Sequence, residues 1–283
     1  MKIILSRKGF DSEYGAQASP FIKHDRTLLS LPIPADDKDT ERFSNLNFNK
    51  KTYFEIISEL NPKTKIKVND YCHLDPDLNR KNQNDREKGW LPLFGQSDKA
   101  QGHLRNNNIG EGDLFLFFGW FKETEWVGHK LQYKKDAPDQ HIIWGYLEIG
   151  KIYNIEEMKT ISELPRWAHY HSHAQKNRLG EPNNRLYIAT KSLSLVSTLP
   201  GGGCFNYNDR LVLTKKGASK RSHWELPQFF KNKQIEITYH SKSSYQSGYF
   251  QSVAKGQEFV ITDTKNKDVE KWAKKLIEVG TKG

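Results

Sequence analysis

The stretches DLFLFFGWF (residues 113–121) and HIIWGYLEIG (residues 141–150) are nearly continuous apolar and aromatic runs. Runs of this kind predict strands that are buried on both faces at the centre of a sheet. Further strands are expected outward from this pair, in KIIL (2–5), RLYIAT (185–190), RLVLTK (210–215), IEITYH (235–240) and EFVITD (258–263). The chain is therefore expected to be built around one sheet.

Two segments, 50–60 and 268–280, carry apolar residues at the i, i+3, i+4, i+7 spacing of an amphipathic helix. These residues are Tyr53, Ile56, Ile57 and Leu60 in the first segment, and Val269, Trp272, Leu276 and Ile277 in the second. In the second helix, Asp268 is expected to cap the start and Gly280 the end. The intervening polar region from Asn61 to Asp113 is expected to be a long loop, and long ordered loops are often functional.

Strands outnumber helices, which favours the α+β class. We expect a strongly bent mixed sheet, or a β-barrel core, with helices at its periphery. The chain of 283 residues has no linker, repeat or low-complexity tract, so we expect residues 1–283 to form a single domain.

Composition excludes several classes of protein. No run approaches the roughly 18 apolar residues of a membrane span, and the apolar stretch of the opening MKIILSRKGF is too short for a secretory signal. A cytoplasmic protein with no membrane partner is therefore expected. Cys72 and Cys204 lie far apart, which excludes a CxxC zinc knuckle or a disulfide framework.

The charge balance, 44 Lys and Arg against 34 Asp and Glu, gives a net charge of +10, and aromatic residues make up 12% of the chain. Basic and aromatic side chains together suit phosphate contacts and base stacking, so DNA or a nucleotide is the expected partner. The alternative is that scattered lysines form solvated surfaces and the 215–221 segment a charged hairpin tip. The candidate nucleic-acid-binding residues are Arg7, Lys8, Arg105, Lys215, Lys216, Lys220, Arg221 and Trp224.

The segment YCHLDPDLNR (71–80) places His73, Asp75 and Asp77 at every second position. In an extended chain these side chains would converge on a proton, a metal or a basic partner. We predict that they form one polar catalytic pocket with Asp11 and His103, in which an imidazole beside carboxylates performs acid and base chemistry. Alternatively, Asp75 opens a proline turn and Asp77 caps it.

The segment HYHSH places His169, His171 and His173 at alternate positions. On a strand, two of them could share Zn²⁺ or Fe²⁺, although the spacing also suits an exposed strand edge and does not match HExxH. We therefore assign no metal ligand from the sequence. The glycines of LPGGGCF (199–205) match neither a phosphate-binding P-loop nor a dinucleotide fingerprint, so no cofactor can be named.

Two family resemblances follow from these motifs. GEGDLFLFFGWF with IIWGYLEIG, within residues 110–150, resembles the strand pair of PUA-like barrels, including ASCH and EVE domains. The ordered series LSRKGFDSEYG, HLDPDL, GWLPLFGQ, AQGHLRNNNIGEGDLFLFFGWF, LSLVSTLPGGGCF and AKGQEFVI resembles the nucleotide modification associated domain 3 family.

The PUA-like resemblance implies binding of RNA or modified bases. The other family occurs in bacteria and phages and is proposed to act in modifying bases or nucleotides of DNA. Three functions stay open: an enzyme of nucleotide or DNA-base modification, a non-catalytic reader of modified bases, and an antiphage protein that senses a nucleotide. The reaction, the oligomeric state and any protein partner are left open.

Overall fold

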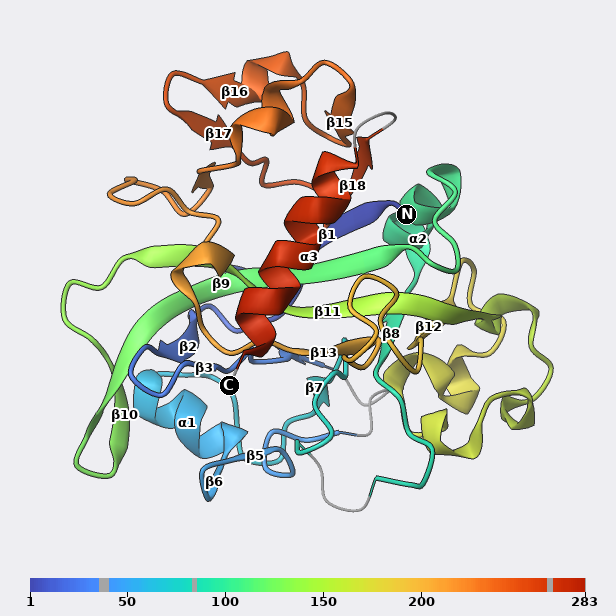
Figure 1. Cartoon of the computed structure of the whole chain (residues 1–283). Coiled ribbons are helices and arrows are strands. Elements are labelled where there is room, and N and C mark those ends of the chain that lie inside the picture. The colour runs from blue at the N-terminus through green and yellow to red at the C-terminus, as the bar shows by residue number, and fades with distance from the viewer. Residues whose placement is uncertain (36–40, 83–85, 264–266, 283) are drawn as a thin grey trace.

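The computed structural model describes residues 1–35, 41–82, 86–263 and 267–282. Its largest element is a mixed sheet of 11 strands, in which the main path runs β15-β18-β1-β9-β11-β12-β8 (Figure 1). The path consists of β15 (Ile235–Ile237), β18 (Glu258–Asp263), β1 (Ile3–Arg7), β9 (Leu114–Val127), β11 (Asp139–Asn154), β12 (Arg185–Ala189) and β8 (Leu93–Gln96). β1 pairs with β9 in parallel, and the other neighbours on the path are antiparallel.

Four short strands flank this path: β2 (Ser19–Ile22), β3 (Thr27–Leu28), β10 (Lys130–Tyr133) and β13 (Gly202–Cys204). Three small sheets join β4 (Ile33–Pro34) to β7 (Cys72–His73), β5 (Asn47–Phe48) to β6 (Lys51–Thr52), and β17 (Tyr249–Gln251) to both β14 (His223–Trp224) and β16 (Tyr245–Gln246).

The two quoted apolar runs are the central strands β9 and β11, as predicted. The first six residues of β9 are all buried, and side chains become partly exposed beyond Gly119. A Cβ at Gly119 would lie 2.6 Å from the carbonyl oxygen of Lys8, so only glycine lets β9 pass this close to the end of β1.

The sheet is strongly bent. Gln96 of β8 donates a hydrogen bond of 2.6 Å to Glu258 of β18, although the two strands lie near opposite ends of the path. Inside the bend, Phe94 packs edge-on against Phe115 and Phe117 of β9. The described strands do not close a barrel, so the α+β class with a bent mixed sheet is confirmed and the PUA-like core is not.

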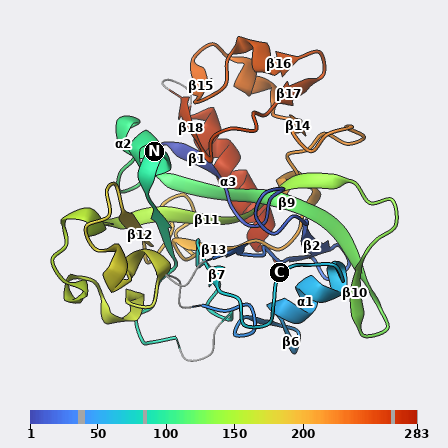
Figure 2. The same cartoon turned by 180° about the vertical axis from the view of Figure 1, so that it is seen from behind.

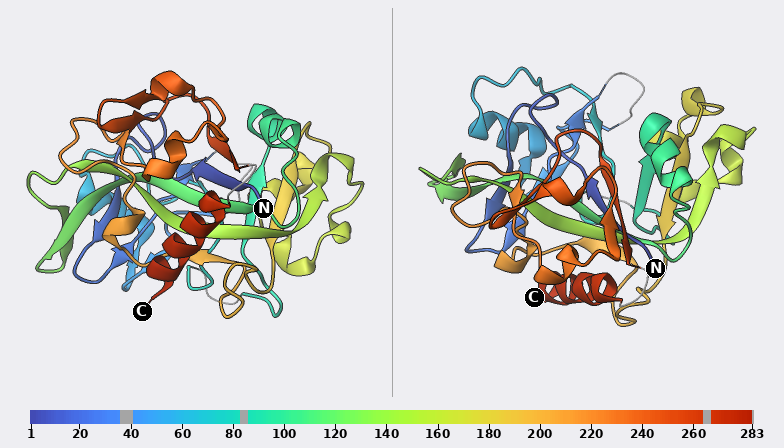
Figure 3. Two further views of the ribbon diagram at one scale, coloured as in Figure 1. Left: turned by 45° about the horizontal axis from the view of Figure 1, so that its top comes forward. Right: turned by 90° about the horizontal axis from the view of Figure 1, so that it is seen from above.

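The helices are peripheral, as expected. α1 (Tyr53–Leu60) buries its predicted stripe and starts with a reciprocal capping box between Thr52 and Glu55. α3 (Asp268–Thr281) lies on the other side of the long strands from α1 (Figures 2 and 3). The predicted caps of α3 were wrong. Asp263 accepts the first N–H groups of the helix, and Gly280 lies inside it, where a Cβ would meet the ring of Phe205 at 2.6 Å.

Two other predictions also differ from the structure. Residues 210–215 form a 3₁₀ turn, Asp209–Leu211, and isolated bridges instead of a strand. The expected long loop between Asn61 and Asp113 contains β7, β8 and the helix α2 (Asp98–Asn106). No helix among the described residues is long and apolar enough to span a membrane.

Apolar side chains gather in three clusters, which meet near β7 and β8. Leu74 belongs to the cluster under α1, and Phe94 to the large cluster along β9 and β11. Ala174 belongs to a third cluster, formed by β8, β12 and 3₁₀ turns between residues 155 and 178. The cluster under α1 therefore holds the polar side chains of β7, and the third cluster holds those of the 3₁₀ turns.

Candidate functional site

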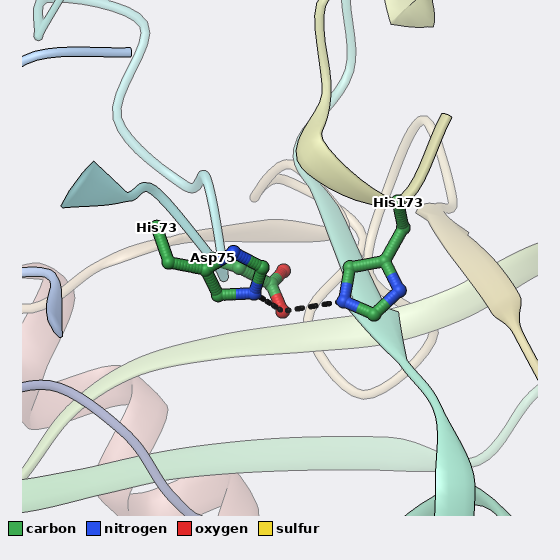
Figure 4. A group of neighbouring side chains, drawn as sticks. All are labelled: His73, Asp75 and His173. Atoms are coloured by element: carbon green, nitrogen blue, oxygen red, sulfur yellow. Dashed lines mark ion pairs between the residues drawn. The ribbon is translucent and has the colours of Figure 1, made fainter. Parts of the chain in front are cut away.

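The segment after β7 brings two of its three predicted polar side chains toward one point. β7 ends at His73, and the backbone N–H of Asp75 donates to the carbonyl oxygen of His73 at 2.8 Å, which closes a tight turn. Cys72 and Leu74 are buried in the core, whereas His73 and Asp75 face each other. His73 Nε2 lies 3.7 Å from Asp75 Oδ2. The predicted convergence therefore holds for this pair, and a histidine from the 3₁₀ turns joins it (Figure 4).

Asp75 is the centre of the group, and its two oxygens have different surroundings. Oδ1 accepts a hydrogen bond of 2.7 Å from the backbone N–H of Gly95 in β8. Oδ2 faces two imidazoles, at 3.7 Å from His73 Nε2 and 3.8 Å from His173 Nε2. Burial alone would raise the pKa of the Asp75 carboxyl group, but its contacts with His171 and His73 hold that pKa well below the usual range. Asp75 is therefore a buried anion.

His173 approaches Asp75 across the backbone of β8. A Cβ at residue 95 would meet the His173 ring at 2.2 Å, so the glycine makes room for the imidazole. The Nδ1 of His173 lies 2.7 Å from the Oδ1 of Asn184. Burial lowers the pKa of His173 to about 3, although the Asp75 charge acts in the opposite direction. His173 is therefore neutral at pH 7.

The three histidines of HYHSH do not lie on a strand. They fall in and beside the 3₁₀ turns η3 (Arg166–Ala168) and η4 (Ser172–Ala174), where His171 and His173 both face Asp75 and His169 does not. The His169 ring contacts the carbonyl oxygen of Leu164. His171 Nε2 lies 3.2 Å from Asp75 Oδ1, at an angle that makes no hydrogen bond, and has no other partner in the described part of the chain.

The remaining predicted catalytic residues lie elsewhere. Asp77 is fully buried, where Arg86 and the hydroxyl of Tyr170 each approach its Oδ2 to 2.6 Å. His103, on α2, contacts Thr238 Oγ1 at 3.0 Å. Asp11 caps a turn by accepting the backbone N–H groups of residues 13 and 14. Within the described residues, the predicted common pocket is therefore wrong: only His73 and Asp75 of this set come together.

Two hollows lie near these groups. A cavity of about 60 Å³ borders Asp75 and is also lined by Tyr53, Trp144 and Cys204. The Trp144 indole N–H is buried without a hydrogen-bond partner among the described residues. A larger open groove of about 850 Å³ is lined by side chains that include Arg7, Asp11, Trp120, Lys220 and Arg221.

The predicted nucleic-acid-binding residues divide into two groups. Trp224 is fully buried, and its indole N–H donates to His141, so its ring cannot stack on a base. Lys8 is nearly buried and pairs with Glu258 at 3.1 Å. The exposed or partly exposed remainder is Arg7, Arg105, Lys215, Lys216, Lys220 and Arg221. The Arg221 guanidinium lies 4.2 Å above the Trp120 ring, an aromatic side chain that the sequence did not single out.

His73, Asp75 and His173 are the described residues whose arrangement could hold a metal ion, because one ligand atom from each lies within 4.8 Å of the others. Sequence reasoning found the first two as one set and placed His173 in a separate set with His169 and His171, of which His171 also lies beside Asp75. The sequence signal for this site is a His-x-Asp spacing together with a distant histidine. These two parts form one site only because β8 brings both segments together. Gly95 and Asn184 gave no signal in the sequence.

A model of the nucleotide modification associated domain 3 family matches residues 2–262. That range includes His73, Asp75, His173 and every residue of the open groove. Comparison with curated proteins gave no match, and comparison with solved structures gave none either. Because the match spans nearly the whole chain, this protein belongs to the nucleotide modification associated domain 3 family.

Proposed function

We propose that this protein is an enzyme that modifies a nucleotide or a DNA base, with His73, Asp75 and His173 at its reaction centre. The observation that carries the proposal is the convergence of two imidazoles on one oxygen of a buried carboxylate. Buried ionisable groups with strongly shifted pKa values cluster at catalytic sites more often than elsewhere. Membership of a family named for nucleotide modification supports the substrate class.

Substrate would reach this centre past His73. The His73 side chain retains 18% of its exposure, whereas Asp75 and His173 retain 4% each. A base or sugar that approaches from solvent would therefore meet the His73 imidazole first. The small cavity beside Asp75 is too narrow for a base, so it does not change this direction of approach.

The open groove is the proposed surface for the sugar-phosphate chain. Its lining carries three cations, Arg7, Lys220 and Arg221, and three carboxylates, Asp11, Glu13 and Asp139, so phosphate would be bound by the cations individually and not by an overall positive surface. The Trp120 ring contributes an aromatic surface. Phosphate contacts with Lys and Arg position nucleic acid without reading its sequence, and aromatic rings stack on any base. Burial lowers the pKa of the Arg7 guanidinium, which is consistent with a side chain held at the floor of the groove.

The experiment is mass spectrometry of nucleosides from DNA and from the nucleotide pool of cells that produce the protein. We expect a nucleoside of altered mass with the wild type and none with Asp75→Asn, which keeps the size of the side chain but removes its charge. His169→Gln is the matched control, because this histidine lies in the same turn region but contacts Leu164 instead of Asp75. Identical nucleosides in all three samples would contradict an enzymatic function.

A reader of modified bases is the second candidate, and one observation favours it: the groove is far larger than the cavity beside Asp75. A reader would bind modified DNA through the groove and release it unchanged. Binding that is lost in Arg221→Ala but kept in Asp75→Asn, without any new nucleoside, would favour the reader over the enzyme.

A further inference from the structure

We propose that His73 Nε2, Asp75 Oδ2 and His173 Nε2 bind one divalent first-row transition-metal ion. The inference concerns the reaction centre of the proposed function and rests on it for its biological role, but the binding site itself is argued from geometry alone. Four observations support it: the distances, the orientation of the His173 ring, the hydrogen bonds around the ligands, and the ligand chemistry.

The ligand atoms are already close to the required positions. An ion that bonds N and O ligands at about 2.0 to 2.2 Å holds neighbouring ligand atoms roughly 3 to 3.5 Å apart. In the structure, Asp75 Oδ2 lies 3.7 Å from His73 Nε2 and 3.8 Å from His173 Nε2. These two distances exceed the required spacing by a few tenths of an ångström, and all three ligand atoms lie within 4.8 Å of one another. Figure 4 shows both imidazoles directed at the same carboxylate oxygen.

The hydrogen bonds of Asn184 fix the orientation of the His173 ring. Asn184 uses its amide Nδ2 to donate to the carbonyl oxygens of His173 and Arg178, which fixes its Oδ1 as the acceptor facing the ring. His173 therefore donates from Nδ1 to that oxygen, at 2.7 Å. This contact holds the ring so that its other nitrogen, Nε2, lies 3.8 Å from Asp75 Oδ2. A metal ion would bind between these two atoms, to the Nε2 of a neutral imidazole and to a carboxylate oxygen.

The supporting contacts are those of a metal site. Metal-bound histidines commonly donate their other ring N–H to an oxygen, and metal-bound carboxylates are commonly hydrogen-bonded as well. Here Asn184 supplies the first contact, and the Gly95 N–H supplies the second through Asp75 Oδ1. Both contacts leave the proposed ligand atoms, Nε2 and Oδ2, directed at the centre.

The ligand types select the class of ion. Imidazole nitrogens suit Fe²⁺, Co²⁺, Ni²⁺, Cu²⁺ and Zn²⁺, whereas Mg²⁺ and Ca²⁺ prefer oxygen ligands only. Two histidines and one carboxylate occupy three positions of an ion that takes four to six ligands, which leaves positions for water or substrate. Because His73 is the exposed member of the set, these positions would face solvent beside it.

The test is a titration of chelator-treated protein with Co²⁺, followed by visible absorption, and with Zn²⁺ by calorimetry. We expect one ion per chain and an increase in Tm when the metal is added. His173→Gln and Asp75→Asn should each weaken binding at least tenfold, whereas His169→Gln should bind like the wild type. If a buried variant does not fold, His73→Gln at the partly exposed position gives the same test.

Less than one tenth of an ion per chain in the wild type would overturn the proposal, as would unchanged affinity in the folded Asp75→Asn or His73→Gln variant. This result is separable from that of the nucleoside experiment. A protein that binds Co²⁺ at this site but yields no new nucleoside would refute the proposed reaction only. A new nucleoside formed equally by metal-free protein in excess chelator would refute a role for the metal in the reaction, and the Co²⁺ titration alone decides whether the site binds metal.

Discussion

Replacing Gly95 by alanine tests the site without removing any ligand. The added Cβ would lie 2.2 Å from His173 Cδ2, 2.3 Å from Cγ and 2.8 Å from Cβ. Carbon atoms pack at about 3.5 to 4.0 Å, so the side chain must retreat by roughly 1 Å. Rotation about χ1 does not move its Cβ, so the backbone of η4 has to shift as well.

The expected effect on metal binding follows from this displacement. Metal sites tolerate errors of about 0.2 Å in ligand distance, so a shift of roughly 1 Å should separate His173 from the ion. Loss of a supporting contact alone typically lowers metal affinity 10- to 100-fold. We therefore expect Gly95→Ala to weaken Co²⁺ binding at least tenfold. Overpacking should also lower the free energy of unfolding by about 1 to 3 kcal/mol.

Gly102→Ala is the control, because no atom lies within 4 Å of the added Cβ in α2. Alanine is a better helix former than glycine by about 1 kcal/mol, so this variant should be at least as stable as the wild type. Its Co²⁺ affinity should not change. Co²⁺ absorption and urea unfolding measure both effects. A folded Gly95→Ala protein with wild-type Co²⁺ affinity would refute the reasoning.

Three further predictions concern ionisable side chains other than the proposed metal ligands. Asp77→Asn leaves the buried Arg86 guanidinium without its counter-charge, so the free energy of unfolding in urea should fall by about 3 to 5 kcal/mol. An unchanged urea midpoint would argue against a stabilising ion pair. Arg221→Ala removes a cation above Trp120, so nucleic-acid affinity should fall. The magnitude of the slope of the logarithm of the association constant against the logarithm of salt concentration should decrease by about 1. An unaltered slope would exclude a phosphate contact. His141 is buried, and burial together with nearby positive charge holds its pKa well below the usual value. The unfolded chain therefore takes up a proton near pH 6.5 that the folded chain does not. As a result, the free energy of unfolding should fall as the pH decreases below about 6.5, by up to about 1.4 kcal/mol per pH unit. His141→Gln should show a shallower dependence, and equal slopes in both proteins would contradict this origin.

The sheet was predictable because its signal is local. β9 and β11 contain nearly continuous apolar runs, and both α1 and α3 carry a complete apolar stripe. The helix α2 was not predicted because it buries only Gln101 and Leu104, which leaves no apolar stripe to detect. The failure at the 210–215 segment is of another kind. Its apolar residues are buried beside β11 by tertiary contacts, without the ladder of a strand.

The site was only half predictable, because its members depend on contacts between distant segments. His73 and Asp75 are two residues apart at the end of β7, so a short local segment was enough to suggest that they meet, although a tight turn and not a strand joins them. His173 joins them because Gly95 lies between the two segments and carries no side chain. Trp224 was misassigned for a similar reason: its basic neighbours suggested a surface, while contacts with Phe118 and Phe250 bury its ring.

The position of the site explains why so few residues can form it. Leu74, Phe94 and Ala174, each next to a residue of the site, belong to three different apolar clusters. The imidazoles and the carboxylate therefore meet only when all three clusters have packed, and each cluster fixes one wall of the site. Any ion or substrate that bridges the site binds the assembled state and not the separated one, so its binding free energy adds to the stability of the whole arrangement. A site of this kind links ligand binding to tertiary structure, whereas a pair of residues on one strand would not.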